Sequence, residues 1–445
     1  MKTAPQPQAK ARALARPTPR QARWQDHELG MFIHFDLNVF MPPGWDHRHY
    51  DDWPETSVFN PAKLDTDQWM EAAMAFGAKF AVLTATHGTG FMLWQSDAYP
   101  FGVRQSPWRG GKGDVVRDFA ASCRRCGIQP GLYSHMCCNG YWKVDHPGLV
   151  NEGRGGDTKK QADYARARAK SLHELWVNYG AMGEIWFDGG LPDSDIIGFD
   201  AAAILRKHQP EAMVFQGPAA TIRWIGNEEG VAPYPCWATV SDDTTAKKGE
   251  GAALGTGDPD GNAWLPGECD VAIRNNTWMW APDTEDRLFS LDRLMDIYER
   301  SVGRNCNLLL NANPNRDGLI PDSDMRRYRE FGAGIERRFG KALAETGGRG
   351  DTVELDLKKP AMIDRVILME QIAEGERIRE YSVAGWVKDQ WRPLCRGQSV
   401  GHKRIERFEP IEVSKVRLSV GKSAAEPLIR KLAVFRAGER QEVRP

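Results

Sequence analysis

Two acidic segments of the chain each follow a short apolar stretch. Asp188 comes directly after Glu184–Phe187 and is followed by two glycines, which would let a ligand approach closely. Glu228 and Glu229 come shortly after the second stretch, Arg223–Gly226. Two carboxylates at the ends of different strands are what hydrolysis of a glycosidic bond requires, one as nucleophile and one as acid and base. Taken singly, Asp188 could instead cap a helix, and adjacent glutamates could simply be solvated on the surface.

Histidine and tryptophan side chains recur near the ends of these and similar apolar stretches. Imidazoles can hydrogen-bond hydroxyl groups. Indoles can stack on the apolar face of a sugar, although each single Trp could equally be a core residue. We predict that the substrate contacts come from a set that comprises His34, His87, Trp45, Trp94, His135, Trp186, Arg274 and Trp278.

The three histidines also raise the alternative of a metal-dependent hydrolase. Barrel hydrolases that use metals usually carry a His-x-His pair on the first strand, whereas this chain has His34-Phe35-Asp36 there. The sequence therefore favours a site without metal, and we expect no metal and no other cofactor.

Short apolar strands alternate with amphipathic helices over residues 24–340, which predicts an α/β fold with a parallel sheet. The predicted strands are Met31–Phe35, Phe80–Thr84, Pro130–Ser134, Glu184–Phe187, Ala212–Phe215, Arg223–Gly226, Val271–Arg274 and Cys306–Asn311. The predicted helices are Asp65–Phe76, Asp114–Cys126, Asp157–Tyr179 and Leu291–Val302, each followed by a glycine that can end a helix. About eight strands fit a (β/α)8 barrel of the TIM type, whose active site lies at the C-terminal strand ends, where the candidate acids and histidines fall.

The pattern changes near residue 345. From Asp351 onward, short segments alternate apolar and polar residues with period two and are separated by turn residues, which indicates an all-β sandwich. We therefore divide the chain into a disordered basic leader (1–16), a catalytic barrel (17–344) and a C-terminal β-sandwich (345–445).

Charge and composition narrow the function classes. The 59 basic and 60 acidic residues give a formal net charge of −1, which argues against a nucleic-acid or membrane-surface partner and suits a small neutral carbohydrate. Eight cysteines in 445 residues are too few for a disulfide scaffold. The basic, proline-containing start lacks the apolar core of a secretory signal, and no apolar run is long enough to span a membrane. We expect a cytoplasmic protein, with a periplasmic location as the alternative. The sequence indicates no particular oligomeric state.

The segment from Pro17 to Gly340 resembles the family 29 glycoside hydrolases, the α-L-fucosidases, and is closest to the subgroup associated with α-1,3/1,4-linked fucose. The matching segments are Gly30–Phe35, Leu83-Thr84 with His87, Gly90-Phe91 with Leu93-Trp94, Gly113–Val116, Gly131–Tyr133, Ile185–Gly189, Arg223–Glu228, Ser301–Asn305 and Asn307–Asn311. Gly397–Arg404 resembles part of the family's C-terminal sandwich.

The resemblance implies a retaining mechanism with a covalent glycosyl-enzyme. Asp188 matches the family nucleophile. Glu228 matches the acid/base of this subgroup, with the adjacent Glu229 as the fallback. The resemblance also places His34, His87, Trp94 and Trp186 in the sugar pocket.

Two positions depart from the family pattern. The family usually has a second histidine directly after His87, where this chain has Gly88, and a glutamate before Trp45, where this chain has Gly44. Both missing groups belong to the set that hydrogen-bonds the hydroxyls of fucose, and such contacts can discriminate strongly between sugars. We predict an exo-acting α-L-glycosidase whose glycone is fucose or a closely related L-hexose, such as L-glucose or L-galactose.

Two other functions remain open at this point. The loss of two pocket groups could mark a catalytically impaired, carbohydrate-binding relative, although the retained Asp188 and Glu228 weigh against that. A metal-dependent barrel hydrolase is the third hypothesis.

Overall fold

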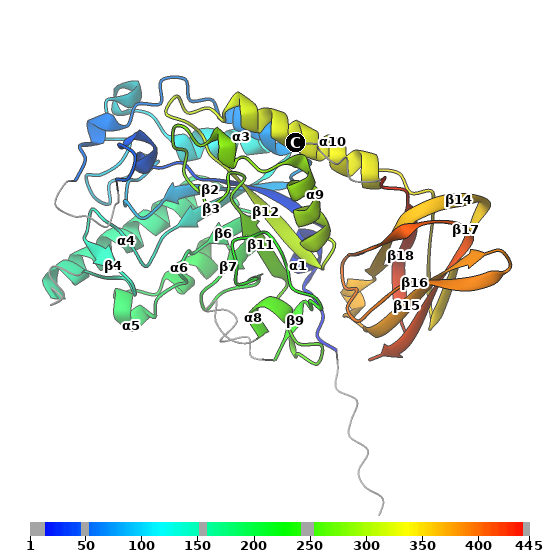
Figure 1. Ribbon diagram of the computed structural model, residues 1–445. Helices are drawn as coiled ribbons and strands as arrows, with labels where there is room; N and C mark the ends of the chain where they lie inside the picture. The colour runs from blue at the N-terminus through cyan, green and yellow to red at the C-terminus, as the bar shows by residue number, and fades with distance from the viewer. Residues whose placement is uncertain (1–13, 46–52, 151–157, 242–252, 439–445) are drawn as a thin grey trace, which may run out of the picture.

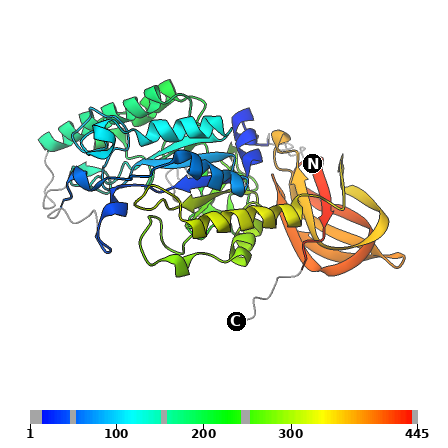
Figure 2. The ribbon, with the colours of Figure 1, turned by 90° about the horizontal axis from the view of Figure 1, so that it is seen from above.

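The computed structural model describes residues 14–45, 53–150, 158–241 and 253–438. It consists of a barrel of strands and helices with a β-rich C-terminal domain at one end, and helix α10 (Asp322–Phe339) runs from the barrel toward that domain (Figures 1 and 2). Most of the predicted leader, residues 1–13, lies outside the described residues. Arg16 forms an ion pair with Glu374 at 3.0 Å.

Eight parallel strands form the barrel, as the alternating pattern predicted. They are β1 (Leu29–Ile33), β2 (Phe80–Thr86), β3 (Gln129–Ser134), β6 (Glu184–Trp186), β7 (Met213–Phe215), β8 (Arg223–Trp224), β11 (Gly267–Val271) and β12 (Cys306–Ala312). Their order around the sheet is β7-β6-β3-β2-β1-β12-β11-β8. A parallel bridge between Phe215 and Ile222 joins the two edges, so the barrel is nearly closed.

The helices pack around this sheet. The four predicted helices are present as α2 (Thr66–Ala75), α3 (Val115–Arg125), α4 (Thr158–Asn178) and α9 (Leu291–Arg300). Asp65 and Asp114 cap the first two by accepting backbone N–H groups of the first turn. Helices α1 (Pro19–His27), α6 (Ala201–His208) and α10, and the single turns α5 (Ser194–Ile197) and α8 (Ala253–Thr256), were not predicted.

The seventh barrel strand lies four residues earlier than predicted. We expected Val271–Arg274, but β11 runs from Gly267 to Val271. The inward-facing residues of β11 are the acids Glu268 and Asp270, which hide the apolar pattern of a buried strand. Each of them accepts one hydrogen bond from an indole N–H, Glu268 from Trp186 at 2.9 Å and Asp270 from Trp224 at 2.8 Å.

Helix α1 closes the N-terminal end of the barrel. Trp24 of α1 is 3% exposed and packs with residues of the barrel interior, among them Phe80 and Met213. Its Nε1 donates a 2.7 Å hydrogen bond to Glu184 at the start of β6. Trp24 thus fills the barrel interior at this end.

The C-terminal domain is an antiparallel six-stranded sheet that wraps around an apolar core of its own. Its strands are β13 (Ala344–Arg349), β14 (Thr352–Glu370), β15 (Ile378–Val387), β16 (Gln390–Gly397), β17 (Arg404–Ser423) and β18 (Leu428–Phe435). The register between the two long strands β14 and β17 shifts at irregularities, which lets the sheet bend into the predicted sandwich.

This domain contacts the barrel at the end opposite to the C-terminal strand ends. Glu28, just before β1, is ion-paired with Lys403 at 2.5 Å and accepts from the His402 ring at 3.0 Å. Although burial opposes its charge, these two neighbours lower the pKa of Glu28 to about 2. Arg365 of β14 pairs with Glu299 of α9 at 3.2 Å. The β-domain therefore supports the barrel from behind the candidate site.

Candidate active site

A cavity of about 720 Å³ opens at the C-terminal ends of the barrel strands. Every residue that lines it comes from the barrel. The lining residues are Phe32, His34, His87, Tyr133, Trp186, Asp188, Gly189, Phe215, Gln216, Trp224, Glu228, Asp270 and Trp278. The two predicted catalytic acids thus share one cavity with four of the eight predicted substrate contacts.

 The four predicted substrate contacts that line the cavity are His34, His87, Trp186 and Trp278. A fifth predicted contact, His135, is not a lining residue, but its ring nitrogen Nε2 lies 3.7 Å from a carboxylate oxygen of Asp188.

Asp188 follows β6 and is held by two side chains of the neighbouring segment. The Tyr133 hydroxyl donates a 2.8 Å hydrogen bond to its Oδ2. Burial and the nearby Asp188 raise the pKa of Tyr133 well above its ordinary value, so the phenol stays a neutral donor. The His135 Nδ1 accepts from the backbone N–H of Cys138 at 3.2 Å, which leaves the proton of the neutral ring on Nε2, facing Asp188. With 46% of its side chain exposed, Asp188 is open to a ligand on its other side.

Glu228 follows β8 on a turn that folds back onto β11. Asn227 stabilises this turn by accepting the N–H of Glu229 at 3.1 Å and donating to the Val231 carbonyl at 3.1 Å. Gly230 has φ +70° and no space for a side chain, because a Cβ would lie 2.8 Å from Val271. The turn directs Glu228 to the cavity, where the Trp278 Nε1 donates to its Oε2 at 2.9 Å, whereas Glu229 is exposed and is not a lining residue.

His34, which follows β1, is 4% exposed and bonded to Asn311 of β12 through Nδ1 at 2.6 Å. Burial lowers the pKa of His34 to about 4, so the ring is neutral at ordinary pH. The Asn311 amide nitrogen donates to the Trp278 carbonyl at 2.9 Å, so its oxygen must accept from His34. The proton is therefore on Nδ1, and Nε2 remains an acceptor that can receive the proton of a sugar hydroxyl.

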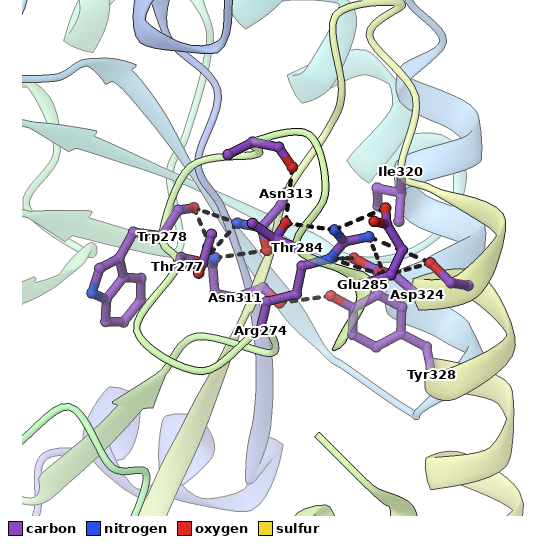
Figure 3. Close-up of polar contacts among 12 residues, drawn as sticks. Arg274, Thr277, Trp278, Thr284, Glu285, Asn311, Asn313, Ile320, Asp324 and Tyr328 are labelled. Carbon is purple, nitrogen blue, oxygen red and sulfur yellow. Dashed lines mark hydrogen bonds and ion pairs between the residues drawn. The ribbon is translucent and has the colours of Figure 1, made fainter. Parts of the chain in front are cut away.

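A network of buried polar side chains holds the loop that carries Trp278 (Figure 3). Asn313 donates to the carbonyls of Thr277 and Trp278 at 2.9 and 2.7 Å, beside the bond from Asn311. Arg274 at the start of this loop forms a fully buried ion pair with Asp324 of α10 at 2.9 Å. These contacts fix the main chain of Trp278, and hence the indole that reaches Glu228.

Aromatic rings form much of the remaining cavity wall. Trp186 stacks on Phe215 with ring centroids 3.5 Å apart and planes 6° from parallel. His87 stacks on Tyr133 at 5.4 Å. Such flat surfaces beside a pair of carboxylates suit a ring-shaped substrate with apolar and hydroxyl-bearing faces.

Comparison with known proteins shows to which family the chain belongs. The alpha-L-fucosidase family profile matches residues 2–338. A plant relative from Oryza sativa subsp. japonica is 33% identical over 94% of this chain and 84% of its own length. Alpha-L-fucosidase 1 of Arabidopsis thaliana is 30% identical over 95% of this chain and 88% of its own length. The chain belongs to the α-L-fucosidase family.

A solved structure of another family member extends the likeness to the whole fold. A crystal structure from Bacteroides thetaiotaomicron VPI-5482 superposes with a TM-score of 0.90 at 40% identity, covering 95% of this chain and 99% of that one. The protein is accordingly a glycoside hydrolase, as the residue pattern and the resemblance predicted.

Three of the predicted sugar contacts are placed elsewhere by the structure. Trp94 is completely buried in the core and donates to Glu174 at 3.1 Å, so it cannot touch a ligand in this cavity. Arg274 is completely buried with its guanidinium on Asp324. Trp45 packs against Trp53 with centroids 5.8 Å apart and is not a lining residue. Neither Trp94, which the family resemblance suggested, nor Arg274, which was expected at the end of a strand, lines the cavity.

Seven lining residues were absent from the predicted set of site residues, namely Phe32, Tyr133, Gly189, Phe215, Gln216, Trp224 and Asp270. Tyr133 and Phe215 lie on predicted strands, and their positions near the strand ends were an available signal. Asp270 was hidden by the misplaced seventh strand. It is 4% exposed, and burial with the nearby Glu228 and Asp188 raises its pKa to about 8.

The hypothesis of a metal enzyme requires a cluster of ligands. Within the described ranges of the chain, no group of three or more His, Cys, Asp or Glu side chains could hold a metal ion. Asp36, the partner of His34 in the His-x-Asp pattern, instead accepts from the Thr89 hydroxyl at 2.7 Å. The same part of the chain contains no helix long and apolar enough to cross a membrane.

Proposed function

We propose that this family member is a retaining, exo-acting α-L-glycosidase that works through a covalent glycosyl-enzyme. The observation that carries the proposal is that Asp188 and Glu228 line one closed-ended cavity, each fixed by a neutral hydrogen-bond donor. Retaining hydrolysis needs this pairing of a nucleophile with an acid that later becomes a base.

In the first step, an oxygen of Asp188 attacks the anomeric carbon while Glu228 gives its proton to the departing glycosidic oxygen. The Tyr133 hydroxyl holds Oδ2 of Asp188, which leaves Oδ1 as the attacking atom. Trp278 holds Oε2 of Glu228, which leaves Oε1 to carry the proton. In the second step, Glu228 takes a proton from water, the resulting hydroxide attacks the anomeric carbon, and the bond to Asp188 breaks.

The glycone is an α-L-fucosyl unit or a closely related L-hexose, such as L-glucose or L-galactose. Family membership favours fucose, the sugar named in the relatives' activity. Gly44 and Gly88 remove two side chains that would hydrogen-bond sugar hydroxyls, and a Cβ at Gly44 would meet no other atom within 4 Å. A pocket that lacks these groups gives up part of its preference among L-sugars that differ in a hydroxyl.

The test is a panel of 4-nitrophenyl α-L-glycosides that comprises the fucoside, galactoside and glucoside. We expect turnover of at least one, with the α-anomer of the sugar as the first product by NMR. The Asp188→Asn variant should lose at least about a thousandfold in kcat/KM, while Asp195→Asn, an exposed residue of α5, should match the wild type. First formation of the β-anomer would refute the retaining mechanism.

The alternative of a catalytically impaired carbohydrate-binding relative is decided by the same panel. Binding of a free L-sugar without turnover of any glycoside would favour that alternative. Turnover that disappears after exhaustive chelation and returns with a divalent metal would instead favour a metal-dependent hydrolase.

A further inference from the structure

A third carboxyl group faces the cavity beside the two catalytic ones. Asp270 lies on β11 two residues after Glu268, so both side chains point into the barrel, with Asp270 in the layer nearer the cavity. It is 4% exposed and is one of the lining residues. The Trp224 Nε1 donates to its Oδ1 at 2.8 Å, which fixes the orientation of the group.

The surroundings of Asp270 keep it uncharged. Glu228 faces it from the turn after β8, Asp188 from the loop after β6, and Glu268 from its own strand. Burial, opposed by the Trp224 bond and reinforced by Glu228 and Asp188, raises the pKa of Asp270 to about 8. Because Oδ1 accepts the indole N–H, the proton of the neutral acid belongs on Oδ2. At neutral pH the free oxygen of Asp270 is thus a hydrogen-bond donor.

The cavity then offers sugar hydroxyls both an acceptor and a donor. His34, which follows β1, presents an acceptor nitrogen, and Asp270 of β11 presents a donor O–H. A uronic acid or other anionic ligand would instead bring its charge next to Asp188 and Glu228 and would be disfavoured.

We propose that Asp270 is a sugar-binding residue, whose Oδ2 donates a hydrogen bond to a hydroxyl oxygen of a neutral L-sugar in the cavity. This inference rests on the proposed function, which it deepens. The contact selects for a sugar hydroxyl in a pocket that lacks side chains at Gly44 and Gly88. Trp224 is a positioning residue for it.

The experiment measures the inhibition or dissociation constants of free L-fucose, L-galactose and L-glucose for the full-length wild type, Asp270→Ala and Asp270→Asn. Asparagine keeps an oxygen for Trp224 and offers an N–H donor to the cavity, whereas alanine offers neither. At pH 6 we expect Asp270→Ala to weaken binding of the best sugar by roughly tenfold to a hundredfold, and Asp270→Asn to stay within about fivefold of the wild type. The deoxy analogue that lacks the contacted hydroxyl should bind wild type and Asp270→Ala equally.

A second readout follows the proton. Above about pH 8, wild-type binding should weaken relative to Asp270→Asn, because only the wild type loses the donor there. Glu228, Asp188 and Glu268 are present in both proteins, so their titration is common to the comparison. Thermal unfolding of each variant identifies any loss that comes from misfolding.

Three outcomes overturn the proposal. Equal weakening by alanine and asparagine would mean that Asp270 binds as an ionised acceptor, and unchanged binding by folded Asp270→Ala would mean that it touches no sugar. Absence of binding by every L-sugar would overturn this inference and the proposed function together. Binding that depends on Asp270 in a protein that cleaves no glycoside would leave this inference standing and refute only the glycosidase activity.

Discussion

Replacing Glu228 with alanine tests the acid/base role against its adjacent neighbour, because Glu229→Ala is a matched control one residue away. Only Glu228 lines the cavity and accepts a hydrogen bond from Trp278. A positioned general acid contributes about 10²- to 10⁴-fold, which corresponds to roughly 3–5 kcal/mol of transition-state stabilisation. Glu229 is exposed, so its removal should change stability by less than about 0.5 kcal/mol and leave turnover unchanged.

The size of the loss should depend on the leaving group. A glycoside with a sugar or alkyl leaving group needs the proton from Glu228, and we expect its kcat/KM to fall by the full 10²- to 10⁴-fold in Glu228→Ala. A dinitrophenyl glycoside leaves without protonation, so its kcat/KM should fall far less. Trp278→Phe removes one hydrogen bond to the exposed carboxyl of Glu228. It should lower kcat/KM by roughly fivefold to tenfold, or about 1 kcal/mol, for the glycoside with a sugar or alkyl leaving group and leave that of the dinitrophenyl glycoside unchanged.

The assay compares kcat/KM for the two leaving groups in each variant, with azide added to Glu228→Ala. Azide should accept the glycosyl group from the covalent intermediate, restore turnover of the activated substrate and yield a glycosyl azide of retained configuration. The reasoning is refuted if Glu229→Ala, and not Glu228→Ala, shows the dependence on leaving group. It is equally refuted if both leaving groups lose the same factor in Glu228→Ala.

Two further predictions concern stability against pH. The pKa of Glu28 is about 2 in the folded protein and near 4.3 when unfolded, so its ion pair with Lys403 stabilises the fold above the unfolded value and is lost as the pH falls through about 2. Glu28→Gln should therefore cost about 3 kcal/mol at pH 7 and about 1 kcal/mol near pH 2.5, measured by urea unfolding against the exposed control Glu412→Gln. A cost that does not change with pH would contradict this. Burial and the neighbouring Glu184 raise the pKa of Glu268 well above its ordinary value. Relative to an ionised carboxylate at this position, the protonated group stabilises the folded protein below the pKa that Glu268 has in the unfolded chain, and this stabilisation is lost as the pH rises. The melting temperature of Glu268→Gln relative to wild type should increase from pH 5 to pH 9, and a constant difference would count against a protonated Glu268.

The barrel was predictable from the sequence because its strands and helices alternate with clear periodicity. Seven of the eight strands were located within a few residues, and the β-rich end was recognised by its period-two pattern. The seventh strand failed because Glu268 and Asp270 point inward, where apolar side chains are expected. Its acids are stabilised by the indoles of Trp186 and Trp224, which come from other strands, and a contact of that kind has no local signal.

The candidate acids could be singled out because each follows a predicted strand and the two segments resemble family motifs. The direction in which individual side chains point could not be predicted from the sequence. The family resemblance placed both Trp94 and Trp186 in the sugar pocket, yet the first is enclosed by the core and the second lines the cavity. Arg274 was predicted to contact the substrate, but Asp324 on the distant helix α10 holds it away from the cavity. Tyr133 was not predicted, and it lines the cavity. Contacts with residues that are distant in the sequence determine which of these side chains reach the cavity.

The abundance of tryptophan in this chain has a physical reason beyond sugar stacking. An indole N–H can satisfy a buried carboxyl group without placing a positive charge beside it. A cation would favour the ionised form, whereas an acid catalyst and a donating carboxyl both need to keep their protons. None of the described residues that line the cavity is lysine or arginine, so its acids are surrounded by neutral donors. The tryptophans that donate to carboxyl groups are Trp24 to Glu184, Trp94 to Glu174, Trp186 to Glu268, Trp224 to Asp270 and Trp278 to Glu228. Four of these pairs follow the barrel interior from its closed end to the cavity, so neutral indole donors hold carboxyl groups both in the barrel core and at the candidate site.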